Sequence, residues 1–84
     1  MRTSMKELVE FIVKSLVDYP EEVVVNEVEG TAATILELSV ADSDMGRVIG
    51  RNGRVINSIR AILQVMAAKQ GKRVTLEVLE TENR

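Results

Sequence analysis

The chain has 84 residues, 45% of them hydrophobic and 29% charged, which predicts one globular domain with a modest core. Its net charge of −2 does not by itself suggest a polyanionic partner. Cysteine and histidine are both absent, which excludes disulfides and thiolate sites and removes the usual general base and metal ligand. No segment approaches the roughly 20 apolar residues of a membrane span or shows the apolar core of a signal peptide, so we expect a cytoplasmic protein with no membrane partner.

The first predicted element is a helix over residues 4–18. Ser4 and Glu7 have the spacing of a capping box, and the residue before Pro20 is pushed out of helical geometry, which ends the helix. An apolar stripe runs along it at helical spacing: Leu8, Phe11, Ile12 and Leu16, widened by Met5, Val9 and Val13. We expect Phe11 to lie in the core.

Two strands follow the helix. Residues 23–29 are rich in β-branched side chains, and residues 34–40 alternate, with Leu36, Leu38 and Val40 on one face. The intervening Glu29-Gly30-Thr31 is a turn signal, so the pair is predicted to form a β-hairpin with one buried face.

The second half of the chain contains two further helices and a strand. Asp42 and Asp44 are cap-forming residues at the start of a short helix, an explanation simpler than a metal site, and Gly50 ends that helix. A longer helix begins near Gly53, reaches residue 70 and ends at Gly71. Residues 74–79 alternate as a third strand, and residues 81–84 are expected to be a frayed tail.

The resulting order is α-β-β-α-α-β. A two-helix crossover joins the last two strands, so they are predicted to be parallel, while the hairpin strands are antiparallel. The expected architecture is an α+β fold with a three-stranded mixed sheet and all helices packed on one face.

The most informative segment is the run Val48-Ile49-Gly50-Arg51-Asn52-Gly53-Arg54-Val55-Ile56. Two glycines bracket two polar residues, after a short apolar segment and before the long helix. Glycine permits unusual backbone geometry and close approach of a ligand, and unpaired N–H groups with a positive dipole lie at a helix N-terminus. The loop is therefore suited to a phosphodiester backbone.

Charge is unevenly distributed along the chain. Residues 1–42 hold three basic and nine acidic residues, a net charge of −6, whereas residues 43–84 hold eight basic and four acidic residues, a net charge of +4. Between residues 45 and 73 there is no acid, and seven cations occur there: Arg47, Arg51, Arg54, Arg60, Lys69, Lys72 and Arg73. Such a patch favours a polyanionic ligand, although basic residues also solvate ordinary helices.

These elements in this order resemble the bacterial type II KH fold. Residues 48–59 resemble the KH signature Val-Ile-Gly-x-x-Gly-x-x-Ile-x-x-Ile, and the segments 8–14, 18–23 and 27–30 resemble the small bacterial single-KH RNA-binding family called KhpA. The resemblance covers nearly the whole chain. It implies one KH domain over residues 1–84 with its GXXG loop at 50–53, which clamps about four nucleotides.

The resemblance implies roles for named residues. Gly50 and Gly53 allow close approach to RNA, Arg51 and Arg54 supply charge together with Arg47 of the cationic patch, and Asn52 donates to phosphate or sugar oxygens. Three apolar residues form part of the groove floor in this reading: Val48, Ile49 and Ile56. Each of them is alternatively a core residue, and for Ile56 the core is the favoured role. In the same reading, residues of the last strand contact base edges.

A second surface lies on the long helix. Its predicted core residues are Val55, Ile56, Ile59, Ile62, Leu63 and Met66. Ala61, Val65 and Ala68 fall on a separate strip opposite that core, and small residues let two helices approach closely. The strip is either a self-association face or a set of isolated surface apolar residues.

The favoured function is a non-enzymatic RNA-binding module that grips single-stranded RNA without a cofactor, as a global RNA-binding regulator or RNA chaperone. The alternative is a protein-interaction adaptor or ribosome-assembly factor with a KH fold. The resemblance also implies a partner, a larger Jag-type KH protein linked to cell elongation and cell shape. The strip on the long helix predicts a homodimer, or a heterodimer with that Jag-type protein.

Overall fold

The computed structural model of the chain describes residues 4–80, so the predicted tail at 81–84 lies outside the described residues. Three helices and three strands form the domain: α1 (Met5–Leu16), β1 (Val24–Glu29), β2 (Thr34–Ser39), α2 (Met45–Ile49), α3 (Arg54–Lys69) and β3 (Val74–Val78). Short 3₁₀ turns occupy Pro20–Glu22, Asp42–Asp44 and Arg51–Gly53. The order α-β-β-α-α-β is the one predicted for the type II KH fold.

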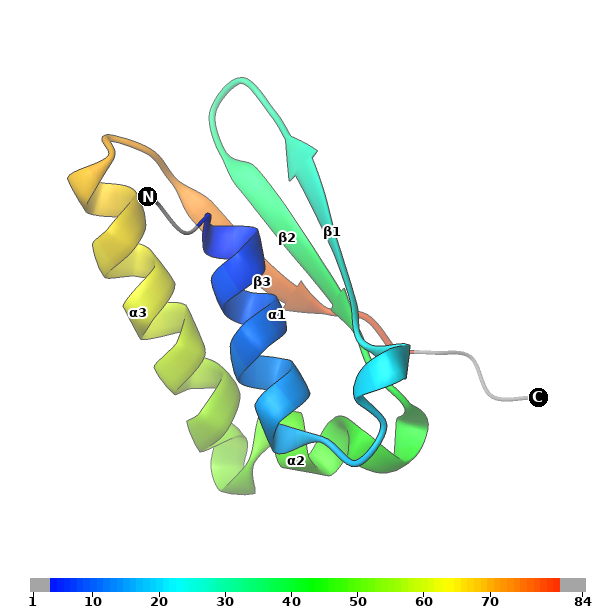
Figure 1. The fold of residues 1–84 in the computed structure, drawn as a ribbon. Coiled ribbons are helices and arrows are strands. Elements are labelled where there is room, and N and C mark those ends of the chain that lie inside the picture. The colour runs from blue at the N-terminus through cyan, green and yellow to red at the C-terminus, as the bar shows by residue number, and fades with distance from the viewer. Residues whose placement is uncertain (1–3, 81–84) are drawn as a thin grey trace.

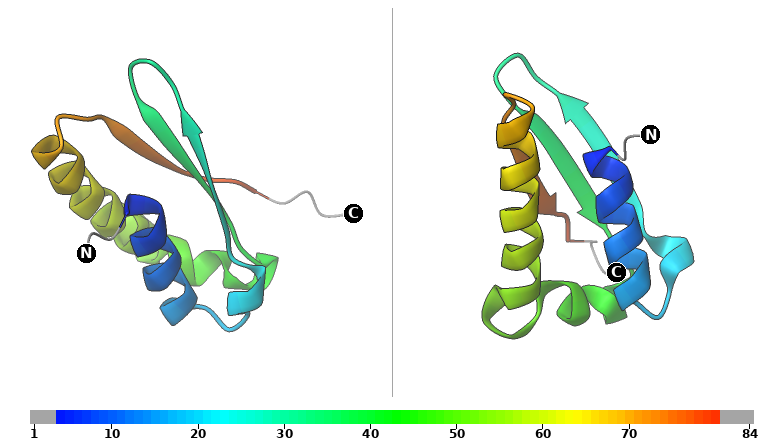
Figure 2. Two further views of the ribbon diagram at one scale, coloured as in Figure 1. Left: turned by 45° about the horizontal axis from the view of Figure 1, so that its top comes forward. Right: turned by 60° about the vertical axis from the view of Figure 1, so that its left-hand side comes forward.

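The three strands form one sheet in the order β1-β2-β3. β1 pairs antiparallel with β2, and β2 pairs parallel with β3, with Leu36 opposite Leu76 in the register. In Figures 1 and 2 the helices all lie on one face of this sheet, α1 beside α3 with α2 across their lower ends. The predicted mixed sheet, the hairpin and the single helical layer are thus confirmed.

The hydrophobic core lies between the sheet and the helices. The inner face of the sheet contributes Val25, Leu36, Leu38, Val74 and Leu76, and the helices contribute Val9, Val13, Val48, Ile56, Ile59, Leu63 and Ala67. The alternation predicted for residues 34–40 and 74–79 places Leu36, Leu38, Val74 and Leu76 inward, because successive strand residues point to opposite faces.

Local signals fix the ends of the two long helices. At the start of α1, the Ser4 side chain accepts a hydrogen bond from Glu7 N at 3.0 Å and the Glu7 carboxylate accepts one from Ser4 N, which confirms the capping box. At the end of α3, Gly71 has φ +67°, and the N–H groups of Gly71 and Lys72 donate to the carbonyls of Ala68 and Ala67. This pair of bonds is a Schellman motif, in which glycine takes the left-handed position.

Two expected core residues are instead exposed. Phe11 is 71% exposed and Ile62 is 48% exposed, while Ala67, which the sequence did not single out, is buried. The reason is geometric: α1 faces the sheet through Val9 and Val13, and at 100° per residue this turns Phe11 outward. The helical layer is one helix deep, so its outer side has no protein over it.

None of the helices between residues 4 and 80 combines the length and the apolar character that a membrane span requires.

Candidate nucleic-acid interface

The loop at 50–53 joins α2 to α3 by a sharp reversal of the chain. Gly50 N donates to Gly46 O at 2.8 Å, closing α2, and Gly50 itself has φ +78° and ψ 169°. Asn52 and Gly53 follow in left-handed geometry, with φ values of +57° and +74°. Asparagine tolerates this region better than most residues, so both polar loop positions and both glycines fit the backbone.

The two glycines are required to different degrees. A Cβ on Gly50 would lie 2.5 Å from Val55 Cγ2 and 2.8 Å from Val55 N, so the first turn of α3 packs directly on the bare Gly50 backbone. A Cβ on Gly53 would meet only Asn57 Nδ2, at an ordinary 3.5 Å. Gly50 is therefore fixed by space and backbone angle, and Gly53 by backbone angle alone.

The loop presents polar groups outward at the start of α3. Arg51, Asn52 and Arg54 are exposed, and the break at Gly50 separates the backbone amides that follow it from the helical ladder of α2. The α3 dipole adds positive potential at the same point. This places side-chain cations, an amide and backbone N–H groups at one end of the domain.

The apolar residues around the loop take core positions. Val48 and Ile56 are buried in the hydrophobic core, and Ile49 is partly buried against it. Of the two roles left open for Val48 and Ile56, the core role matches their burial, and a contribution of all three to RNA binding stays a prediction.

Arg47 is held by two carboxylates. Its Nη2 lies 3.0 Å from Asp18 Oδ2, and its Nε lies 3.6 Å from Asp44 Oδ1. Arg47 therefore links α2 to the segment after α1. A phosphate would compete with these two carboxylates for the Arg47 guanidinium. Its RNA-binding role stays a prediction.

Asp44 does not cap α2, which corrects the sequence interpretation. Its side chain makes no capping bond; instead its two oxygens accept from the backbone N–H groups of Asp18 and Tyr19, each at 3.0 Å. The fully buried carboxylate thus stabilises the chain where it leaves α1. Within residues 4–80 no three possible metal ligands lie together, and Asp42 and Asp44 belong to no such cluster.

Arg60 and Gln64 connect one flank of α3 to β3, and Asn57 on the same flank accepts a hydrogen bond from Arg60. None of the three was predicted as a site residue from the sequence. Arg60 Nε donates to Leu76 O at 3.0 Å, Arg60 Nη1 to Asn57 Oδ1 at 3.3 Å, and Gln64 Nε2 to Val74 O at 3.4 Å. Their helical spacing and polar character were the available signal. The signal was incomplete because the position of β3 beside this flank is a tertiary property.

β3 forms an open edge of the sheet. Thr34 N donates to Arg73 O at 2.9 Å and Leu79 N to Leu38 O at 2.8 Å, so the odd-numbered residues of this segment turn their backbone groups toward β2. Backbone groups alternate along a strand, so those of Val74, Leu76 and Val78 face the free edge. The flank of α3 and this edge together border the surface that begins at the loop.

The predicted strip on α3 is exposed along its length. Ala61 and Ala68 are exposed, and Val65 is 64% exposed. Ala68 also lines a cavity of about 470 Å³ beside β3, so it lies at the boundary between the strip and the β3 flank.

Comparison with known sequences identifies one family. The family described as KhpA/KhpB, KH domain, matches residues 6–78. The relatives named RNA-binding protein KhpA include that of Borreliella burgdorferi, which is 55% identical over 88% of this chain and 90% of the relative. That of Clostridium perfringens is 53% identical over 89% of this chain and 100% of the relative. That of Chlamydia pneumoniae is 50% identical over 90% of this chain and 97% of its own.

Comparison with solved structures shows a shared fold. Aquifex aeolicus Era bound to GDP and aluminium fluoride matches 88% of this chain with a TM-score of 0.61 and 22% identity. Era in complex with MgGDPNP and a segment of 16S ribosomal RNA matches the same share, with a TM-score of 0.56 and 21% identity. The match covers 29% of the first Era chain and 28% of the second, so this chain spans less than a third of the length of either.

Proposed function

Because the chain belongs to the KhpA/KhpB family of KH domains, which is non-enzymatic, we propose that it is a single RNA-binding KH domain. Its ligand would be single-stranded RNA, and its compartment the cytoplasm. The loop at 50–53 clamps the sugar-phosphate backbone. Its relatives over nearly the whole chain are named RNA-binding proteins, which supports the ligand class.

The observation that carries this proposal is the geometry of the loop. Gly50 holds a backbone conformation that is essentially restricted to glycine, and it packs against Val55 without a side chain between them. The reversal leaves Arg51 and Asn52 exposed at the N-terminal end of α3. A turn needs no cation at its tip, whereas a phosphate clamp does.

The bases would then lie along the flank of α3 that faces β3. Asn57, Arg60 and Gln64 provide amide and guanidinium groups there. Because the outward carbonyls of Val74 and Leu76 already accept from Gln64 and Arg60, the edge of β3 would contribute its outward backbone N–H groups. Described aromatic side chains are limited to Phe11 and Tyr19, neither of them in the loop or on α3. Affinity would thus depend on backbone clamping and polar contacts rather than on the aromatic stacking used by other RNA-binding folds.

Self-association is the second part of the proposal. One KH domain grips about four nucleotides, so pairing two domains raises affinity through effective concentration. The exposed strip of Ala61, Val65 and Ala68 supports pairing with a second copy or with a larger Jag-type KH protein. Contacts to the sugar-phosphate backbone carry no sequence information directly, which favours action on many transcripts as a global RNA-binding regulator or RNA chaperone.

The decisive experiment replaces the two loop residues with acids. R51D/N52D places two carboxylates against the phosphates, and aspartate tolerates the left-handed geometry of position 52, so the fold is expected to survive. We expect fluorescence anisotropy with a labelled oligoribonucleotide to show loss of binding, and circular dichroism to match the original protein.

The matched control is K14E/N26D, which changes net charge by the same −3 at exposed positions on α1 and β1. It should retain most of the affinity. If R51D/N52D folds normally and binds RNA as well as the control does, the loop is not the clamp and the proposal is wrong.

A further inference from the structure

The strand β1 forms an open edge of the sheet on the side opposite β3. Gly30 N donates to Ala33 O at 2.9 Å, and bonded and non-bonded pairs alternate along an antiparallel register. The even-numbered residues of β1 therefore bond to β2, and the backbone groups of Val25, Glu27 and Glu29 face the free edge. An extended peptide lying along β1 would find N–H donors and carbonyl acceptors there.

The two edges of the sheet differ in how far they are already occupied. Gln64 of α3 donates to the outward carbonyl of Val74 on β3. Arg60 of α3 donates likewise to the carbonyl of Leu76. No side chain between residues 4 and 80 bonds to the free edge of β1 in this way, and the strand has no proline, lysine or bulge to block it. β1 is therefore the edge that is open to a further strand.

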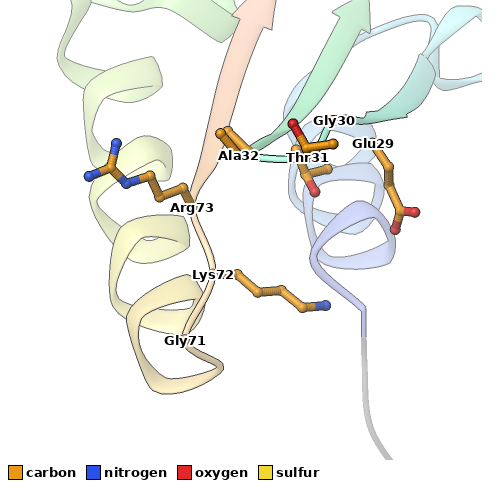
Figure 3. A pocket seen from close by; sticks show the side chains of 9 residues that line it. Glu29, Gly30, Thr31, Ala32, Gly71, Lys72 and Arg73 are labelled. Carbon is orange, nitrogen blue, oxygen red and sulfur yellow. The ribbon is translucent and has the colours of Figure 1, made fainter.

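The surroundings of β1 favour a cationic partner. Residues 15–46 contain eight acids and no lysine or arginine. Glu27 and Glu29 are exposed on β1, and neither forms an ion pair within residues 4–80. In Figure 3, Glu29 and Arg73 lie on opposite sides of the cavity at the hairpin turn, and Lys72 extends between them. A segment that carries lysine or arginine is thus complementary to this edge.

The side chains of β1 differ in character between its two faces. Glu27 and Glu29 share the helix side of the sheet with buried Val25, because alternate strand residues point the same way. Val24 and Val28 lie on the outer side and are 49% and 47% exposed. A second copy of β1 is a poor neighbour, since pairing the two strands would bring glutamates of both copies together. A strand with basic residues on one side and aliphatic residues on the other matches both faces.

We propose that β1 is a docking edge for an extended protein segment in which lysine or arginine alternates with aliphatic residues, added to the sheet as a fourth strand. Directly opposite residues of neighbouring strands lie on the same face, so the basic side chains would pair with Glu27 and Glu29. The aliphatic side chains would pack beside Val24 and Val28. The docking edge includes neither the loop nor α3, so it is independent of the proposed RNA site.

The test uses fluorescence anisotropy with a labelled eight-residue peptide in which lysine and valine alternate. The control peptide has the same composition in two blocks, four lysines followed by four valines, so it cannot place all its lysines on one side of a strand. The original protein should bind the alternating peptide about fivefold more tightly, the ratio expected from two cross-strand ion pairs. Equal binding of the two peptides would reduce the interaction to general charge attraction and overturn the proposal.

Charge reversal on β1 gives a second readout. E27K/E29K should lose the preference for the lysine peptide and instead prefer a peptide in which glutamate and valine alternate. E77K/E80K makes the same charge change at exposed positions in and after β3, and it should keep the original preference. A preference that changes equally in both variants would follow net charge alone, and β1 would then not be the docking edge.

The backbone contribution is separated by comparing E27P with E27Q. Both remove the carboxylate, but only proline removes the N–H group at the free edge, a position where edge strands tolerate it. E27P should bind the alternating peptide about two- to tenfold more weakly than E27Q.

Hydrogen exchange measured by NMR locates the peptide on the original protein. Exchange should slow at the amides of Val25, Glu27 and Glu29 when the alternating peptide binds. Slowing at β3 instead would place the peptide on the other edge. Slow exchange of all three amides before the peptide is added would mean that a second copy covers β1, and either result would overturn the proposal.

Discussion

At the residue scale, Gly50 and Gly53 occupy equivalent places in the GXXG pattern but face different surroundings. Gly50 combines φ +78° and ψ 169° with a Val55 methyl group 2.5 Å from its ideal Cβ position. Gly53 has a left-handed backbone, and a Cβ there would make only an ordinary contact with Asn57 Nδ2 at 3.5 Å. The first is a region that only glycine populates, and the second costs other residues about 1–2 kcal/mol.

We therefore predict that G50A lowers the free energy of unfolding by about 3 kcal/mol or more, and G53A by about 1–2 kcal/mol. Urea denaturation followed by circular dichroism measures both. Equal losses in the two variants would show that the contact between Gly50 and the first turn of α3 contributes little to stability.

Single residues also show where sequence reasoning reaches its limit. The Ser4–Glu7 capping box was predictable because both partners lie within one turn of helix. Asp44 was misjudged as a cap because its true partners, the N–H groups of Asp18 and Tyr19, are about 25 positions away in the chain. Local rules cannot reveal a hydrogen bond that only the tertiary fold creates.

At the element scale, α3 serves three surfaces at once. One face packs on the sheet through Ile56, Ile59 and Leu63, one flank bonds the edge of β3, and the outward side carries the exposed strip of Ala61, Val65 and Ala68. The periodicity of α3 predicted its inner face and the strip. It did not predict that Ile62 would be exposed or Ala67 buried, because the exact rotation of a helix depends on its packing partners.

The strip gives a prediction about assembly. Ala61 is exposed, so A61E should not disturb the fold, but a carboxylate between two closely packed helices would be buried without a partner. We expect light scattering to report a dimer for the original protein at tens of micromolar and a monomer for A61E.

N26E, which adds the same charge at an exposed position on β1, should remain dimeric. A dimer that persists in A61E would move the interface to another surface. A monomeric original protein would leave the Jag-type partner as the remaining candidate for this strip.

At the scale of the whole molecule, charge is divided between two regions. The acidic half of the sequence forms α1, β1 and β2, and the cations between residues 45 and 73 lie on α2, the loop, α3 and the segment between α3 and β3. A net charge of −2 therefore conceals a cationic side that attracts a polyanion and an acidic side that repels it. We expect this arrangement to orient an RNA strand toward the loop and to disfavour binding elsewhere.

This division predicts a definite salt dependence. A tetranucleotide without terminal phosphates has three phosphodiester groups, so neutralising all of them should give a slope of about −2 for log affinity against log salt. Anisotropy titrations across a range of potassium chloride concentrations measure the slope. R51D/N52D should bind too weakly for a titration even at low salt. K14E/N26D should retain the slope, because its new acids lie on α1 and β1 rather than in the loop. A slope near zero in the original protein would mean that apolar or base contacts dominate binding, and that the cationic side is not the surface that holds the RNA.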